Sequence, residues 1–243
     1  MKFLGIDFGW RSGASGLCCL QIEGTKLQLL NCQRQVEIAD ILAWVDGWMT
    51  GDESAMIAVD APTLIPNETG MRLPDRLTHK YFGRYHAGCY PANLKRPFAE
   101  RTVQFGLSLQ ERGFQHAPTI TAKKKGRYQI EVFPHPAIVH LFNLERILKY
   151  KKGKLADRKL ELQKLLTLIT TQLPKAEPAL GVPLPFSTAL TSLKGRELKA
   201  LEDQVDSLLC AYVAAHWWYW GSERNWVLGD RKTGYIVLPA KMQ

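Results

Sequence analysis

The order of the strand-like segments at the start of the chain is the feature that most narrows the possible folds. Residues 2–8 form an apolar run that ends in Asp-Phe-Gly, which is typical of a buried strand leading into a turn. Two further runs, residues 17–22 and 26–34, are joined by the hairpin signal Glu23-Gly24-Thr25. The pattern predicts three consecutive antiparallel strands.

Later strand-like segments cannot extend this meander, because helix-like patterns separate them. Residues 39–49 carry apolar side chains at helical spacing, and residues 55–59 then form a short apolar run that ends at Asp60. Residues 128–133 form another such run, closed by prolines. Parallel strands need long crossovers, usually helical ones. We therefore expect an α/β fold with a mixed sheet, antiparallel first and parallel later, flanked by helices.

The rest of the chain predicts more helix and a final pair of short strands. A length of 243 residues without repeats or a clear linker favours a single domain over residues 1–243. Residues 61–126 are rich in proline and basic side chains and read as a helical insert. Helices are expected at about residues 74–85, 97–112, 137–144, 157–171 and 197–220, and strands at 226–228 and 235–238.

Acidic side chains stand at unusual places in this pattern. Asp7 and Asp60 end or follow apolar strands, and Glu131 lies inside an otherwise uncharged one. Asp206 lies among apolar residues of the last helix, with Asp203 one turn earlier. A carboxylate avoids a buried strand unless it is paired or bound to a cation. A local hydrogen bond explains any one of these acids, but the set calls for a shared explanation.

A divalent cation is the natural shared explanation. Mg²⁺ prefers oxygen ligands, and two such ions roughly 3.5–4 Å apart can activate a water and stabilise the leaving oxygen of a phosphodiester. For Asp203 a solvated position on the helix is as good an expectation as a ligand role. His86 and His135 are candidates for proton transfer or phosphate contact, although a structural role is the commoner one for a lone histidine.

The charge of the chain is unevenly distributed. The formal net charge is +9, but residues 1–71 carry −5 and residues 72–243 carry +14. A solvated basic surface explains this excess as well as an anionic partner does. If the partner is nucleic acid, the candidate backbone contacts are Arg72, Arg76, Lys80, Arg84, Lys95, Arg96, Lys123, Lys124 and Lys125. Among them lie Tyr81, Phe82, Tyr85 and Tyr90, which either stack on unpaired bases or form the core of the insert.

Cysteine usage and hydropathy bear on the compartment. The five cysteines form no Cys-x-x-Cys motif, which favours reduced thiols and a cytoplasmic protein. No apolar run approaches the roughly 18–20 residues of a membrane span, so we expect no membrane association. The oligomeric state is left open.

Several short motifs resemble one family when taken in order. They are Gly5-Ile6-Asp7-Phe8-Gly9-Trp10, Val59-Asp60-Ala61-Pro62, Glu131-Val132-Phe133-Pro134-His135-Pro136, the Asp-x-x-Asp helix from Asp203 to Ala211, and Gly234-Tyr235-Ile236-Val237-Leu238-Pro239. Together they look like the predicted RNase H-like nuclease family catalogued as domain of unknown function 429. Ser207, where the family more often has alanine, and the lysine-rich stretch from Tyr150 to Lys154 are departures from its pattern.

The resemblance implies a ribonuclease H-like fold, a nucleic-acid partner and an Mg²⁺- or Mn²⁺-dependent nuclease site. Carried over by position, Asp7, Asp60, Glu131 and Asp206 are the expected catalytic and metal-binding residues, with Asp203 as a further ligand. Two alternatives remain open. One is a non-catalytic nucleic-acid-binding protein on the same fold, and the other is an ATP-dependent phosphotransferase of the actin and sugar-kinase superfamily, whose first phosphate-binding turn Asp7-Phe8-Gly9 resembles.

Overall fold

A mixed sheet forms the centre of the computed structural model, which describes residues 1–186 and 190–241. Its strand order is β5-β6-β4-β1-β2-β3-β7 within that part of the chain. Strands β1 (Lys2–Asp7), β2 (Ser15–Glu23) and β3 (Lys26–Gln35) are antiparallel neighbours, while β4 (Ala55–Val59) and β6 (Arg127–Glu131) run parallel to β1. This confirms the predicted α/β class and the predicted order of an antiparallel meander followed by parallel strands.

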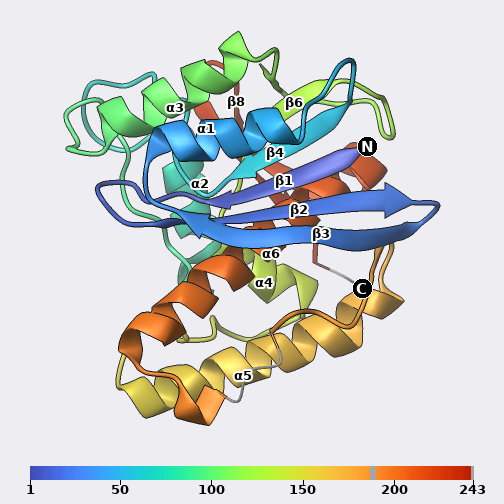
Figure 1. The fold of residues 1–243 in the computed structure, drawn as a ribbon. Coiled ribbons are helices and arrows are strands. Elements are labelled where there is room, and N and C mark those ends of the chain that lie inside the picture. The colour runs from blue at the N-terminus through green and yellow to red at the C-terminus, as the bar shows by residue number, and fades with distance from the viewer. Residues whose placement is uncertain (187–189, 242–243) are drawn as a thin grey trace.

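The remaining elements cover the sheet or extend its edges (Figure 1). The helices are α1 (Ile38–Gly47), α2 (Leu73–Phe82), α3 (Ala99–Glu111), α4 (Pro134–Leu141), α5 (Leu155–Gln172) and α6 (Gly195–Trp220). Single 3₁₀ turns are Gly83–Tyr85, Leu173–Lys175, Leu190–Ser192 and Gly221–Glu223. Edge strands β5 (Gln115–His116) and β7 (Ala179–Leu180) are short, and β8 (Asn225–Asp230) and β9 (Gly234–Pro239) form a separate hairpin.

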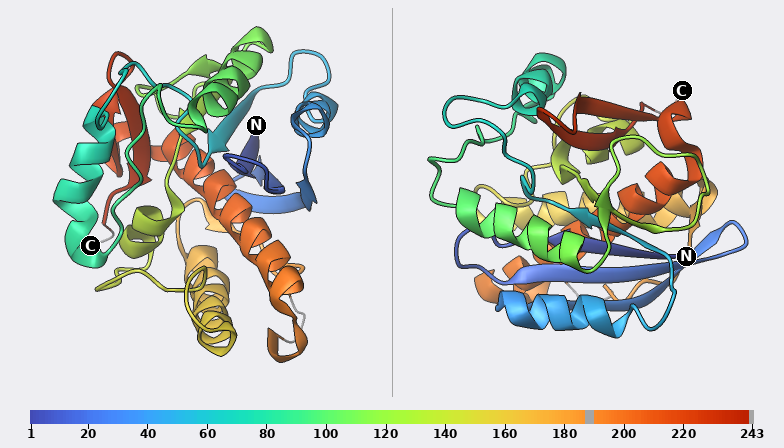
Figure 2. Two further views of the ribbon diagram at one scale, coloured as in Figure 1. Left: turned by 90° about the vertical axis from the view of Figure 1, so that its left-hand side faces the viewer. Right: turned by 90° about the horizontal axis from the view of Figure 1, so that it is seen from above.

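The two faces of the sheet bury different side chains of β1. Leu4 and Ile6 join a cluster with residues of α1 and α3, whereas Phe3 joins the larger core that contains most of α6. The alternation follows from the two-residue period of a strand. Figure 2 shows the result: α1 and α3 lie on one face, and α6 runs diagonally across the other.

Helix α6 packs against the sheet at unusually short range. A side chain at Gly5 would overlap the backbone of Ser207 and Ala211, and one at Gly16 would overlap the backbone of Asp203. Glycine at both places lets the helix touch β1 and β2 directly. The close approach fixes where the acidic first half of α6 meets the end of β1.

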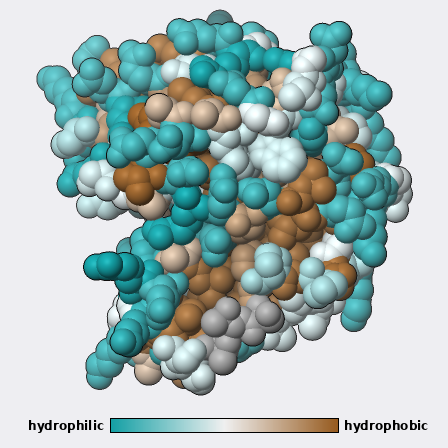
Figure 3. Space-filling model, viewed as in Figure 1, coloured by the Kyte–Doolittle hydropathy of each residue, from teal (hydrophilic) through white to brown (hydrophobic). Residues whose placement is uncertain are grey.

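Helix α5 and the first turns of α6 extend away from the sheet (Figure 1). Seen as a surface, the protein is hollowed between them and the edge of the sheet, and hydrophobic residues gather there (Figure 3). No helix in residues 1–186 or 190–241 is long and apolar enough to cross a membrane.

Element boundaries differ from the sequence-based prediction mainly where prolines and short edges occur. Helix α4 begins at Pro134 rather than near residue 137. Proline can occupy the first turn of a helix, because the backbone N–H that it lacks would have no partner within the helix there. Strands β5 and β7 were not predicted, since two residues carry no detectable alternation.

Candidate active site

The carboxyl ends of three parallel strands, together with the middle of helix α6, bring the acidic residues together. Val59 pairs with Ile6 on one side and with Glu131 on the other, so Asp7, Asp60 and Glu131 leave the sheet at the same edge. The backbone N–H of Asp60 donates to the Ile6 carbonyl at 2.9 Å, and this hydrogen bond holds Asp60 beside the end of β1. Asp206 reaches the same edge from α6, and its side chain is buried.

Burial dominates the electrostatics of this cluster. It raises the pKa of Asp7 to about 7 and that of Asp60 well above its ordinary value. The charges of Asp7, Asp206 and Glu131 raise the pKa of Asp60 further, so the carboxylates act on one another. Like charges gathered in this way need a cation.

Lys151 supplies that positive charge in the structure. Its ammonium contacts a carboxylate oxygen of Asp206 and lies 3.1 Å from Oδ2 of Asp7. Burial by itself would lower the pKa of Lys151, but Asp206 and Asp7 raise it well above its usual value. The neighbouring Tyr150 hydroxyl donates to Oδ1 of Asp206 at 2.7 Å. Sequence reasoning missed Lys151, although the lysine-rich departure from the family pattern is where it lies.

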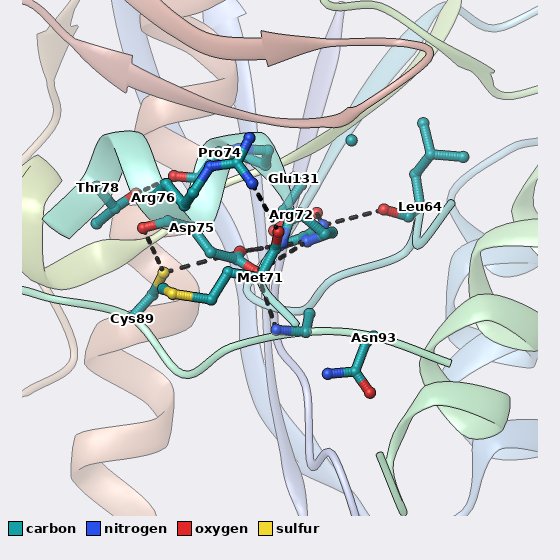
Figure 4. A network of polar contacts seen from close by, with 12 residues as sticks. Leu64, Met71, Arg72, Pro74, Asp75, Arg76, Thr78, Cys89, Asn93 and Glu131 are labelled. Carbon is teal, nitrogen blue, oxygen red and sulfur yellow. Dashed lines mark hydrogen bonds and ion pairs between the residues drawn. The ribbon is translucent and has the colours of Figure 1, made fainter. Parts of the chain in front are cut away.

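Glu131 has a cation of its own, Arg72 (Figure 4). The two terminal nitrogens of the guanidinium donate to the two Glu131 oxygens, each at 2.7 Å, and Nη2 also donates to Oδ1 of Asp75 at 2.9 Å. Burial raises the pKa of Glu131 to about 7, and Arg72 limits the rise. Arg72 is only 3% exposed, so the structure places this expected backbone contact inside the site rather than on the surface.

Asp203 lies beside the cluster and has different partners. It is buried, and its carboxylate pairs with Arg34 of β3 at 2.8 Å and with Lys199 one turn earlier on α6. Its charge contributes to the raised pKa of Asp7. The structure thus brings Asp7, Asp60, Glu131 and Asp206 together and leaves Asp203 at their margin.

A cavity of about 510 Å³ opens next to Asp60 and Glu131. Four of its lining residues are aromatic: Trp10, Tyr90, Phe98 and Phe133. Basic side chains also line it, and of these Arg11 and Lys152 are exposed. These residues lie in loops, where no periodicity in the sequence points to them.

The two candidate histidines lie in different surroundings. His135 lines the cavity, and its buried Nδ1 has no hydrogen-bond partner among residues 1–186 and 190–241. Burial lowers the pKa of His135 to about 4, so its ring is neutral at pH 7. His86 is exposed at the end of a 3₁₀ turn and does not line the cavity.

The other basic candidates divide between two ends of the molecule. Arg76, Lys80, Arg84 and Lys95 are exposed and Arg96 is half-buried, all within the insert that contributes Tyr90 to the cavity. Lys123, Lys124 and Lys125 lie elsewhere: Lys125 lines a hollow with Lys2 at the start of β1. Asp7 is at the other end of that strand, five residues from Lys2, which at about 3.3 Å per residue is roughly 16 Å.

The aromatic residues of the insert divide as well. Phe82 and Tyr85 are buried in the main core. Tyr81 packs edge-on against Trp226, with the ring centroids 5.7 Å apart. Tyr90 is 71% exposed and lines the cavity. Of the four, Tyr90 has the position from which it can contact a ligand.

Within the described ranges, no group of three or more His, Cys, Asp or Glu side chains is arranged to hold a metal ion. Lys151 pairs with Asp7 and Asp206 instead, and Arg72 pairs with Glu131. All five cysteines are free thiols, and one of them, Cys89, lines the cavity.

Comparisons with known proteins give a family and one solved structure. No curated protein matches the chain. The structure of RuvC from Thermus thermophilus aligns with 88% of this chain and 98% of its own, at 14% identity and a TM-score of 0.35. The family model described as "Protein of unknown function (DUF429)" matches residues 5–232, almost the whole chain. The chain therefore belongs to the DUF429 family.

Proposed function

We propose that this protein is a metal-dependent nuclease that hydrolyses phosphodiester bonds of DNA or RNA. The observation that carries the proposal is the convergence of Asp7, Asp60, Glu131 and Asp206, from four elements, at one edge of the sheet. Desolvating several carboxylates side by side opposes folding, so their gathering is better explained by chemistry than by stability. The cavity with its basic lining lies directly beside them.

The chemical type of the candidate ligands suits a hard divalent cation such as Mg²⁺ or Mn²⁺. Every candidate ligand is a carboxylate oxygen, and Asp7 and Asp206 already share one cation, the Lys151 ammonium. Asp7, Asp60 and Asp206 would hold the ions, with Glu131 as a ligand or water-orienting group and Asp203 as an outer carboxylate. Bound ions would supply an activated water and stabilise the leaving oxygen of the phosphodiester.

The chain's own residues have separate tasks in this proposal. Lys151 neutralises Asp7 and Asp206, and an ammonium displaced from them by a bound ion would be available to a phosphate oxygen. Arg72 holds both oxygens of Glu131 in fixed positions through its two-pronged contact. Arg11 and Lys152, exposed at the cavity, bind the phosphates on either side of the reacting one.

A cleavage panel tests the proposal. Labelled single-stranded DNA, duplex DNA, RNA, RNA–DNA hybrid and branched DNA are incubated with the protein in Mg²⁺ or Mn²⁺ and in chelator. We expect metal-dependent cleavage of at least one substrate, its loss in Asp7→Asn, and wild-type activity in Asp40→Asn, which alters an exposed aspartate of α1. Turnover that persists undiminished in Asp7→Asn contradicts the proposal.

Nucleic-acid binding without cleavage is the second candidate, and one observation favours it. Three of the four carboxylates, Asp7, Asp206 and Glu131, already have lysine or arginine partners. A thermal titration with Mg²⁺ and Mn²⁺ separates the two functions, because a protein is stabilised by an ion that binds only its folded state. The nuclease proposal expects the melting temperature to rise in wild type but not in Asp7→Asn.

A further inference from the structure

We propose that the cavity beside Asp60 and Glu131 receives a single unpaired nucleobase, so that the preferred substrate carries an unpaired nucleotide next to the bond that is cut. This inference rests on the proposed nuclease function and specifies its substrate. The cavity's position supports it, because Asp60 and Glu131 are both part of its lining and so the bound nucleotide would lie against the carboxylate cluster.

The lining of the cavity is suited to a flat, apolar group. Trp10 and Phe98 pack against each other with ring centroids 4.7 Å apart, and Phe133 lies two residues after Glu131, the last residue of β6. The Trp10 indole N–H donates to the Asp60 carbonyl at 2.8 Å, which ties the aromatic wall to the carboxylate edge. Bases of any sequence stack on such rings.

Tyr90 completes the cavity from the insert and is held there. Next to it, Cys89 Sγ donates to Asp75, and the Ala92 N–H donates to Oδ2 of Asp75 at 2.9 Å. Asp75 is in turn paired with Arg72 of the site. The Tyr90 ring is 71% exposed and has no ring partner in the described part of the chain, so one face is free to stack on a ligand.

The polar groups of the cavity match the rest of a nucleotide. His135 is a half-buried side chain of the lining, and its buried Nδ1 lacks a partner in the described ranges, which a base edge or sugar hydroxyl would supply after a small turn of the ring. Arg11 and Lys152 are exposed at the cavity and have the charge for flanking phosphates. A volume of about 510 Å³ is that of a pocket for one small molecule. A base inside a duplex would have to leave its stack to enter it.

Equilibrium binding tests the inference without cleavage, with Ca²⁺ in place of the catalytic ion. The probes are a DNA duplex with one bulged 2-aminopurine, the same bulge with an abasic nucleotide, and the fully paired duplex. We expect the 2-aminopurine bulge to bind most tightly and its fluorescence to be quenched by stacking. Tyr90→Ala should weaken this binding about fivefold or more, while Tyr81→Ala, which alters a tyrosine packed on Trp226, should not.

Two outcomes overturn the inference, and they are distinguishable. If all three probes bind alike and Tyr90→Ala matches Tyr81→Ala, while the wild type still cleaves in a metal-dependent way that Asp7→Asn abolishes, the base pocket is wrong and the nuclease proposal stands. If the wild type neither binds any probe nor cleaves any substrate of the panel, both proposals fail.

Discussion

The charge balance of the carboxylate cluster depends on one side chain, that of Lys151. Its ammonium lies between the half-buried Asp7 and the buried Asp206, which are otherwise two neighbouring like charges. The residue belongs to the loop between α4 and α5, whereas the acids lie on β1 and α6. In the proposed function, Lys151 would compete with a metal ion for Asp7 and Asp206.

Replacing Lys151 by methionine should therefore separate stability from ion binding. Without divalent ions, Lys151→Met should lower the free energy of unfolding by roughly 3 kcal/mol, because it leaves buried carboxylates without their partner. In Mg²⁺ or Mn²⁺ its melting temperature should rise more than that of the wild type. Lys164→Met, which alters an exposed lysine of α5, is the control. If Mg²⁺ or Mn²⁺ raises the melting temperatures of Lys151→Met and Lys164→Met by the same amount, this role of Lys151 is contradicted.

At the scale of elements, the contact between α6 and the sheet positions the site. Gly5 of β1 lies against the backbone of Ser207 and Ala211, one residue and five residues after Asp206. Any separation of helix and strand would move Asp206 away from Asp7. The geometry of the site thus depends on the absence of a side chain at Gly5.

Gly5→Ala should be strongly destabilising. Its methyl group would meet main-chain atoms that cannot rotate away, and overpacking of this kind lowers the free energy of unfolding by about 3 kcal/mol or more. Gly47→Ala, in α1 with open space around it, should instead raise that free energy by about 0.5–1 kcal/mol. Urea unfolding of both variants measures the difference, and a neutral Gly5→Ala would contradict the close packing.

The short strand β5 gives a prediction about pH. Burial lowers the pKa of His116 to about 4 in the folded protein, against about 6.5 when unfolded, and its Nδ1 lies 3.0 Å from the Tyr235 hydroxyl. As the pH falls from 6.5 to 4, the unfolded state takes up a proton first, so the wild type loses stability. The His116→Gln variant lacks this loss. The difference in free energy of unfolding between the wild type and His116→Gln should therefore shift in favour of the variant by on the order of 2–3 kcal/mol between pH 6.5 and pH 4. Unfolding measured at both pH values checks this, since the other histidines affect both proteins alike.

Much of this architecture was predictable from the sequence, and the rest depended on tertiary contacts. The run at residues 55–59 was predicted as a strand and is β4 with the same bounds. A short apolar segment followed by Asp60 and a nearby proline is too short for a helix and favours a buried strand. Arg72 was a candidate for a nucleic-acid backbone contact, which an exposed side chain would make, and charged side chains are rarely buried. Its burial follows from pairing with Glu131, 59 residues away, which no local pattern indicates. Lys151 was missed for the same reason.

At the scale of the whole molecule, the positive charge is distributed over two regions. Arg11, Arg72, Lys151 and Lys152 lie at the site or its cavity, whereas Lys123–Lys125 lie near the opposite end of β1. A nucleic acid bound over Asp7 would contact the first group before the second. Only part of the basic side chains behind the net charge of +9 therefore lies near the site.

Salt dependence of binding should reveal this division. The slope of log affinity against log salt should become shallower by about 1 in Arg11→Ala and again in Lys152→Ala, since each removes one phosphate contact. Replacing Lys123, Lys124 and Lys125 together by alanine should change the slope by less than either single variant does. A larger effect of the triple variant would place the nucleic-acid path on the opposite end of the sheet.

The central claim is that the carboxylates act as one hydrolytic unit, and a double-variant cycle tests it most directly. Single-turnover cleavage of the best substrate is measured for the wild type, Asp7→Asn, Asp206→Asn and the double variant in Mn²⁺. Residues that act as a unit are strongly non-additive. We predict that each single variant loses at least about a thousandfold in rate and that the double variant loses hardly more. Losses that multiply in the double variant, or single variants with rates near that of the wild type, would contradict the claim.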